Sequence, residues 1–130
     1  MSAIPCRGKM RTMPETVLIV DDHDGFRQLA RRLLDGMGYQ VIGEYANGRE
    51  GVQETARLSP DIVLLDVQLP DIDGIEVAAS LNASNNPPHI VLVSNRDAAD
   101  YGPRLARAGA RGFITKADLS AESLLALLAS

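Results

Sequence analysis

The sequence predicts an α/β protein in which a single domain folds around a doubly wound parallel sheet of five strands, with helices on both faces. Short apolar runs rich in β-branched residues alternate with segments in which apolar residues recur at helical spacing. The runs are almost continuously apolar, which is typical of parallel strands buried on both faces. Apolar residues make up 45% of the 130 residues, enough for one buried core.

The first half of the chain contains three expected strands and two expected helices. The first helix is the clearest, because the apolar residues between Phe26 and Met37 fall on one helical face and Gly38 follows as a stop signal. Pro60 separates the second helix from the third strand. The expected elements are a strand at 17–20, a helix at 24–37, a strand at 41–46, a helix at 49–58 and a strand at 62–65.

The second half continues the alternation, with an irregular stretch before the fourth helix. Proline disfavours a helical residue before it and fits the first turn of a helix, so Pro103 predicts a helix start after an irregular loop at 96–102. Ser120 is a suitable N-cap for the last helix. The expected elements are a helix at 75–81, a polar linker at 82–88, a strand at 90–93, a helix at 103–108, a strand at 112–115 and a helix at 121–129.

Composition and charge narrow the functional classes. The net charge is −4 and the acidic residues are scattered, so direct nucleic-acid binding by this domain is not expected. No apolar run approaches the ~20 residues that a membrane span needs. The single cysteine, Cys6, excludes an internal disulfide and fits a reducing, cytoplasmic location.

The N-terminal segment is expected to lie outside the folded domain. Residues 1–15 carry Arg7, Lys9 and Arg11 but lack the apolar stretch of a secretory signal. We therefore expect a disordered arm at 1–15 and a folded domain at 16–130, because chain ends without apolar anchors are usually poorly ordered.

Polar side chains stand just past four of the expected strands. In a parallel sheet of this kind, ligands bind beyond the carboxyl ends of the strands, near the point where the strand order reverses. Each residue alone is a weak signal, since an aspartate after a strand often caps a helix or a turn. Their joint placement predicts one site, formed by Asp21 and Asp22 after the first strand, Asp66 after the third, Ser94 after the fourth and Lys116 after the fifth.

The residue types at this edge predict phosphoryl-transfer chemistry. Three carboxylates in one cleft repel each other and need a cation, and their oxygen ligands suit Mg²⁺ or Ca²⁺ rather than Zn²⁺. Lys116 supplies a positive charge that can pair with Asp66 at rest, and the Ser94 hydroxyl can donate to a phosphate oxygen. A nucleophilic carboxylate, a metal and nearby positive charge are what phosphoryl transfer requires. His23 and His89 are interpreted as a surface residue and a loop residue, not as ligands.

Four sequence motifs resemble the response-regulator receiver domain of two-component signalling. The most specific is the middle one, in which Pro70 and Gly74 follow Asp66 at fixed distances. The resemblance covers about residues 16–129 and implies a flavodoxin-like (βα)5 fold. The motifs are VLIVDDH at 17–23, DIVLLDVQLPDIDG at 61–74, VLVSN at 91–95 and GARGFITK at 109–116.

The resemblance implies a role for each residue of the site. Asp66 is the expected phosphoacceptor, and Lys116 is expected to hold a phosphate oxygen. Mg²⁺ is the expected cofactor. Its expected ligands are Asp22 and Asp66 directly, Asp21 in an assisting position, and the backbone carbonyl of Gln68.

Two further residues resemble the switch pair of this family. Ser94 is expected to move toward the phosphoryl group, which leaves space that Phe113 fills by turning inward. The alternative for Phe113 is a permanently buried core aromatic residue. Because the Phe113 ring carries no hydroxyl, its inward state strands no polar group.

The resemblance implies a signalling switch and not a turnover enzyme. The phosphoryl donor is expected to be a histidine kinase or a phosphotransfer protein, and phosphorylation is expected to change partner binding or homodimer formation. The Lys-Ala-Asp-Leu run at 116–119 resembles the branch whose members often carry a helix-turn-helix output domain. A DNA-binding output domain is therefore expected if the chain belongs to a longer protein, while no membrane contact is expected.

Asn95 departs from the family pattern, since many receivers carry Ala or Gly there. The larger side chain either crowds the phosphate or hydrogen-bonds an attacking water, which leaves the dephosphorylation rate open. The main alternative function is a receiver-like protein-binding module that works without phosphorylation. An aspartyl-phosphate phosphatase commonly carries a second acid where this chain has Gln68, and a nucleotide-binding flavodoxin-like protein needs a glycine-rich loop that does not follow the first strand.

Overall fold

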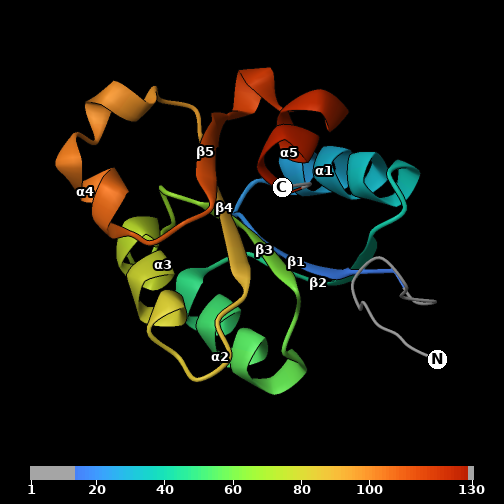
Figure 1. The fold of residues 1–130 in the computed structure, drawn as a ribbon, viewed down its shortest axis with the longest axis horizontal. Coiled ribbons are helices and arrows are strands. Elements are labelled where there is room, and N and C mark those ends of the chain that lie inside the picture. Colours follow the sequence, from blue (N-terminus) through green and yellow to red (C-terminus); the bar gives the residue numbers. More distant parts are fainter. Residues whose placement is uncertain (1–13, 129–130) are drawn as a thin grey trace, which may run out of the picture.

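A computed structural model describes residues 14–128, so most of the expected N-terminal arm lies outside the described residues. The predicted α/β class is confirmed: five parallel strands form one sheet in the order β2-β1-β3-β4-β5 (Figure 1). The elements are β1 (Thr16–Val20), α1 (Asp24–Gly36), β2 (Gln40–Tyr45), α2 (Gly48–Leu58), β3 (Ile62–Asp66), α3 (Gly74–Asn82), β4 (His89–Ser94), α4 (Pro103–Arg107), β5 (Gly112–Thr115) and α5 (Ala121–Leu128).

Helices cover both faces of the sheet and bury its strands. In Figure 1, α1 and α5 lie on one side, whereas α2, α3 and α4 lie on the other. Successive residues of β1 face opposite layers, so Val17 and Ile19 join the α1/α5 core while Leu18 and Val20 join the core under α2 and α3. The strand order reverses between β1 and β3, which places a ligand-binding crevice beyond the ends of these two strands.

The element boundaries agree with the sequence patterns to within one or two residues, and one histidine was placed wrongly. His89 is the first residue of β4 and not part of a loop, because it pairs with Ile62 of β3 and its N–H donates to the Asp61 carbonyl at 2.9 Å. Its side chain is exposed. Pro88 stands just before the strand, where its missing N–H interrupts no ladder bond.

The segment between β4 and β5 contains the shortest α-helix of the described residues. The prediction that this helix begins at Pro103 is confirmed, and α4 runs for only five residues. Before it, a 3₁₀ turn (η2, Ala98–Asp100) interrupts the expected irregular loop. Gly102 then takes φ +60°, which most side chains disfavour, so the chain turns sharply into α4.

The β3–α3 loop is held by a dense set of backbone contacts. The Gly74 N–H donates to the Val67 carbonyl at 2.8 Å, and the Asp73 carboxylate caps α3 by accepting from the Ile75 N–H at 2.8 Å. A Cβ at Gly74 would lie 2.1 Å from the backbone oxygen of Asp66. The fixed distance from Asp66 to the glycine thus follows from a loop that folds back onto the strand end.

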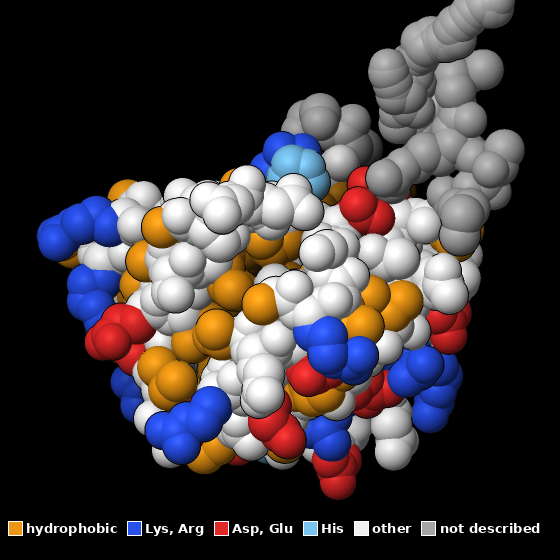
Figure 2. All heavy atoms as spheres, turned by 90° about the horizontal axis from the view of Figure 1, so that it is seen from below, with side chains coloured by type: hydrophobic (Ala, Val, Ile, Leu, Met, Phe, Trp, Pro, Cys, Tyr) orange, Lys and Arg blue, Asp and Glu red, His pale blue; other side chains and the backbone are white. Residues whose placement is uncertain are grey.

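The surface of the described residues is mixed in charge on the face seen in Figure 2. Basic and acidic side chains are interspersed around exposed hydrophobic side chains there, and no broad single-sign area covers that face. Within residues 14–128, no helix combines the length and apolar character needed to cross a membrane.

Candidate functional site

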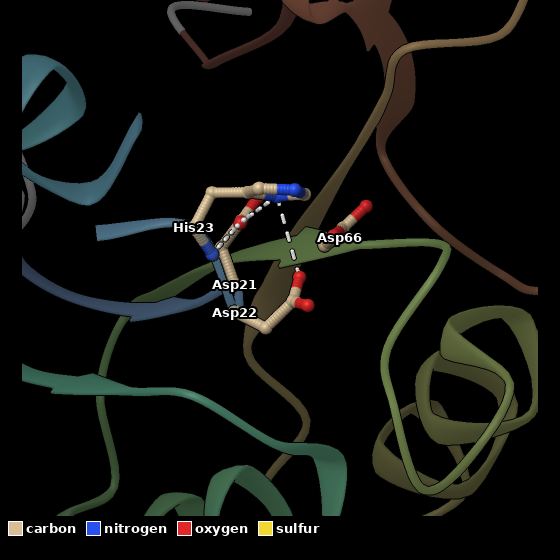
Figure 3. Close-up of side chains that lie close together, drawn as sticks. All are labelled: Asp21, Asp22, His23 and Asp66. Atoms are coloured by element: carbon tan, nitrogen blue, oxygen red, sulfur yellow. Dashed lines mark hydrogen bonds and ion pairs between the residues drawn. The ribbon is translucent and has the colours of Figure 1, made fainter. Parts of the chain in front are cut away.

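Three predicted carboxylates meet at the end of the sheet. Asp66 ends β3, whereas Asp21 and Asp22 directly follow β1, the neighbouring strand. Ligand atoms of these residues and of His23 all lie within 4.8 Å of one another, and Figure 3 shows them around one small space. Asp21 and Asp66 are buried, while Asp22 and His23 are exposed.

His23 is closer to this group than the sequence indicated. Its side chain is exposed, as predicted, but its Nδ1 lies 3.2 Å from Asp21 Oδ1 and 3.3 Å from Asp22 Oδ1 (Figure 3). The His23 backbone N–H also donates to Asp21 Oδ1 at 2.8 Å. The interpretation of His23 as a plain surface residue was therefore incomplete, since the turn after β1 folds its ring back over the carboxylates.

The backbone around the carboxylates is fixed by parallel-sheet contacts. The Asp21 N–H donates to the Tyr45 carbonyl of β2 at 2.9 Å, which extends the ladder one residue beyond β1. Asp66 Oδ1 accepts from the Gln68 N–H at 3.1 Å. The backbone N–H groups of His23 and Gln68 thus hold Oδ1 of Asp21 and of Asp66, whereas Oδ2 of each carboxylate faces Lys116.

Lys116 reaches the carboxylates from the end of β5. Its Nζ lies 2.7 Å from Asp21 Oδ2 and 3.6 Å from Asp66 Oδ2, so its nearer partner is Asp21, whereas the sequence suggested Asp66. The ammonium also sits 4.6 Å from the centre of the Phe26 ring. Because Phe26 belongs to α1, which comes shortly after Asp21 in the chain, this cation–π contact draws the lysine toward Asp21.

The environment of Asp66 disfavours its charged form. Burial, and to a smaller extent the charges of Asp21 and Asp22, raise the pKa of Asp66 to about 6, although the Gln68 N–H and the Lys116 ammonium act in the opposite direction. The folded chain therefore holds a proton on Asp66 more tightly than an unfolded chain does. A bound cation would reverse this preference, since it stabilises the carboxylate.

We expect the unfavourable charged form of Asp66 to make the free energy of unfolding depend on pH. Without divalent cations, the free energy of unfolding should fall as the pH rises from about 4 to about 6, because the native state binds more protons than the unfolded state in that window. Asp66→Asn removes the charge, and it should raise the free energy of unfolding above pH 7 by on the order of 2 kcal/mol. Urea unfolding across this pH range measures both effects.

A matched variant separates the effect of the Asp66 environment from the effect of net charge. Glu76→Gln removes one exposed carboxylate on α3, and its unfolding free energy should keep the wild-type pH profile within about 0.5 kcal/mol. If Asp66→Asn had wild-type stability above pH 7, the ionised Asp66 carboxylate would not destabilise the folded state and the prediction would be wrong.

The carboxylate oxygens that face Lys116 suit a hard divalent cation. Asp21 Oδ2 and Asp66 Oδ2 are buried, and among the described residues their close positive partner is Lys116 Nζ, at 2.7 Å and 3.6 Å. Buried carboxylate oxygens without enough donors are costly. A bound metal ion or a proton would remove this cost. Clustered carboxylate oxygens with one exposed side, at Asp22, fit Mg²⁺, which takes one or two carboxylates and keeps waters.

Ser94 and Phe113 lie on the neighbouring strands β4 and β5. Ser94 is the last residue of β4 and is fully buried, whereas Phe113 of β5 is half-buried. Sequence reasoning missed a third residue: the Tyr101 hydroxyl lies 2.6 Å from Ser94 Oγ, and its ring centre lies 6.1 Å from that of Phe113. No spacing rule pointed to Tyr101, because it follows η2 in an otherwise irregular segment. Asn95 is exposed.

The fold and the site together define a receiver-type signalling domain: a five-stranded parallel sheet with buried aspartates, a lysine and a serine at one edge. A family model described as the response regulator receiver domain matches residues 17–129. The chain belongs to this family of two-component signalling domains.

Curated relatives agree with this assignment. The chain is 38% identical over 112 residues to the response regulator GacA of Pseudomonas viridiflava, covering 85% of this chain and 52% of the relative. It is 35% identical over 104 residues to BvgA of Bordetella pertussis, covering 80% of this chain and 50% of the relative. The chain therefore spans about half the length of these curated relatives.

Solved structures share the fold closely. A LuxR-family two-component response regulator from Aurantimonas sp. SI85-9A1 superposes with a TM-score of 0.80 at 30% identity, covering 89% of this chain and 84% of that one. A CheX-CheY-BeF3-Mg complex from Borrelia burgdorferi gives a TM-score of 0.80 at 25% identity, covering 89% and 87%.

Proposed function

We propose that this receiver accepts a phosphoryl group on Asp66 from a histidine kinase or a phosphotransfer protein. The observation that carries the proposal is the arrangement of the buried Asp66 carboxylate, with Asp21 and Asp22 within 4.8 Å and the Lys116 ammonium 3.6 Å away. An oxygen of Asp66 attacks phosphorus as the phosphorus–nitrogen bond of the donor phosphohistidine breaks, and the released imidazole nitrogen takes up a proton.

The remaining residues of the site support this transfer. Asp22 and Asp66, with Asp21 assisting and the Gln68 carbonyl completing the set, would hold Mg²⁺, which supplies positive charge for the transferring phosphoryl oxygens. Lys116 neutralises a phosphoryl oxygen from the other side, since its side chain is mostly buried and already faces the carboxylates. The Ser94 hydroxyl donates a hydrogen bond to another phosphoryl oxygen. The Phe113 ring on β5 then turns inward into the space that Ser94 leaves.

We infer that phosphorylation is read by an output domain that binds DNA, in the same chain or in a partner. Two observations support this inference: the curated relatives are about twice as long as the matched region, and a similar solved structure is described as a LuxR-family regulator. Homodimer formation after phosphorylation is the expected intermediate step, and sedimentation of the protein with and without a phosphoryl analogue measures it.

The central test is phosphorylation by a small donor. Incubation with acetyl phosphate and Mg²⁺ should add one phosphoryl group by intact mass, whereas Asp66→Asn and metal-free samples should add none. Turnover can hide an adduct, so a parallel sample receives the stable mimic beryllofluoride. A folded protein that takes neither group would remove this proposal and favour a binding module that works without phosphorylation.

A further inference from the structure

The Ser94 hydroxyl is held by the segment that follows β4. Ser94 Oγ lies 2.6 Å from the Tyr101 hydroxyl and accepts the Arg96 N–H at 3.1 Å. Among the described residues both partners lie after β4, and Asp66 is not one of them. Since a serine hydroxyl has one proton and two lone pairs, these two contacts occupy most of its hydrogen-bonding capacity.

Tyr101 links this hydroxyl to the switch aromatic and to α4. Its ring packs against that of Phe113 at a centre-to-centre distance of 6.1 Å and a tilt of 59°. Tyr101 also directly follows η2, where its N–H donates to the Ala98 carbonyl at 3.1 Å, and Gly102 comes next with φ +60°. One side chain thus touches Ser94, packs on Phe113 and stands at the turn into the short α4.

The surroundings of Tyr101 leave room for a change of position. Residues 95–100 are all exposed, so few packed neighbours fix this segment. An apolar hollow of 460 Å³ lies between this segment, α4 and β5. Its lining includes Leu92, Ala98, Ala99, Gly102, Leu105 and Phe113.

We propose that Tyr101 is a positioning residue that holds the Ser94 hydroxyl away from Asp66 until phosphorylation. In the resting state the phenol and the Arg96 N–H hold the hydroxyl toward the segment after β4. When Ser94 turns to donate to a phosphoryl oxygen on Asp66, the contact with Tyr101 breaks, and the ring and the Gly102 turn become free to move with α4. This inference rests on the proposed phosphorylation of Asp66.

Fluorine NMR tests the proposal and the proposed function in one spectrum. The chain has three tyrosines, so fluorotyrosine labelling gives three resonances that Tyr39→Phe, Tyr45→Phe and Tyr101→Phe assign. Addition of beryllofluoride and Mg²⁺ should produce bound-fluoride signals and shift the Tyr101 resonance. Bound fluoride with an unmoved Tyr101 resonance overturns the positioning role alone, whereas the lack of bound fluoride in folded protein overturns the proposed function and this inference with it.

A double-mutant cycle of beryllofluoride affinities measures the coupling between the Tyr101 and Ser94 hydroxyls. Tyr101→Phe keeps the ring on Phe113 and removes only the hydroxyl, so it should tighten beryllofluoride binding about fivefold, the factor expected for one neutral hydrogen bond. In a Ser94→Ala background the same change should have no effect on binding. Weaker binding by Tyr101→Phe would overturn the proposal, because it would mean that Tyr101 supports the contact of Ser94 with the phosphoryl group.

Discussion

A Gly74→Ala variant is expected to lose about 3 kcal/mol of its free energy of unfolding, near the upper end of typical overpacking costs. The added Cβ would lie 2.1 Å from the Asp66 backbone oxygen, 2.6 Å from Val67 Cα and 2.9 Å from the Val67 oxygen. All three neighbours are backbone atoms, so no side-chain rotation relieves the contact. The strand end and the first turn of α3 must separate, and urea unfolding at an unchanged m-value measures the cost.

A second glycine provides the control for this substitution. Gly25 lies in the first turn of α1, as Gly74 does in α3, but a Cβ there meets nothing within 4 Å. Gly25→Ala should therefore be neutral or stabilise by up to ~1 kcal/mol through helix propensity. Equal stability of the two variants would show that a Cβ at Gly74 does not clash with the Asp66 backbone.

The same geometry connects stability to function. The clash falls on the backbone of Asp66 itself, so the proposed phosphoacceptor must shift when the loop opens. We expect the folded fraction of Gly74→Ala to take up phosphate from acetyl phosphate more slowly than Gly25→Ala does. This outcome would explain physically why the motif pairs an aspartate with a glycine at fixed spacing.

The positions of the site residues could be predicted because they depend on the strand pattern alone. Strand ends are marked by the change from apolar to polar residues, and a parallel sheet brings those ends to one edge. Asp66 and Ser94 end their strands, and Asp21 and Lys116 directly follow theirs, as the pattern predicts. The fourth helix also began at Pro103 as expected, since proline restricts the residue before it.

The pairings within the site could not be predicted in the same way. Side-chain partners depend on distances across elements, which no local pattern records. Lys116 thus lies nearer to Asp21 than to Asp66, and the His23 ring turns back over the carboxylates. Tyr101 contacts Ser94 only because η2 and the Gly102 turn bend the segment after β4 toward the sheet.

A Lys116→Met variant is expected to lose about 3 kcal/mol of its free energy of unfolding at neutral pH without divalent cations. The ammonium is the close positive partner of Asp21 and Asp66, whose side chains are only 1% and 2% exposed. Removing it leaves buried carboxylates facing one another without compensation. Methionine retains an apolar contact with the Phe26 ring, so the loss reports charge more than packing.

Acid and magnesium should each reduce this loss, for the same electrostatic reason. Asp66 takes up a proton as the pH falls, which removes one of the repelling charges, and without the Lys116 ammonium its pKa lies above the wild-type value of about 6. Mg²⁺ should stabilise Lys116→Met more than the wild type, because a more negative cluster binds a cation more tightly. Thermal unfolding at several pH values and Mg²⁺ concentrations measures both effects.

An exposed cation on α4 provides the comparison. Arg107→Met removes the same charge far from the carboxylates, and it should change stability by no more than ~0.5 kcal/mol at any Mg²⁺ concentration. Combining Lys116→Met with Asp21→Asn should cost less than the lysine change alone, since the nearer unpaired carboxylate is gone. A loss for Lys116→Met that is insensitive to Mg²⁺, pH and Asp21→Asn would show that Lys116 acts through packing and not as the counter-charge of the site.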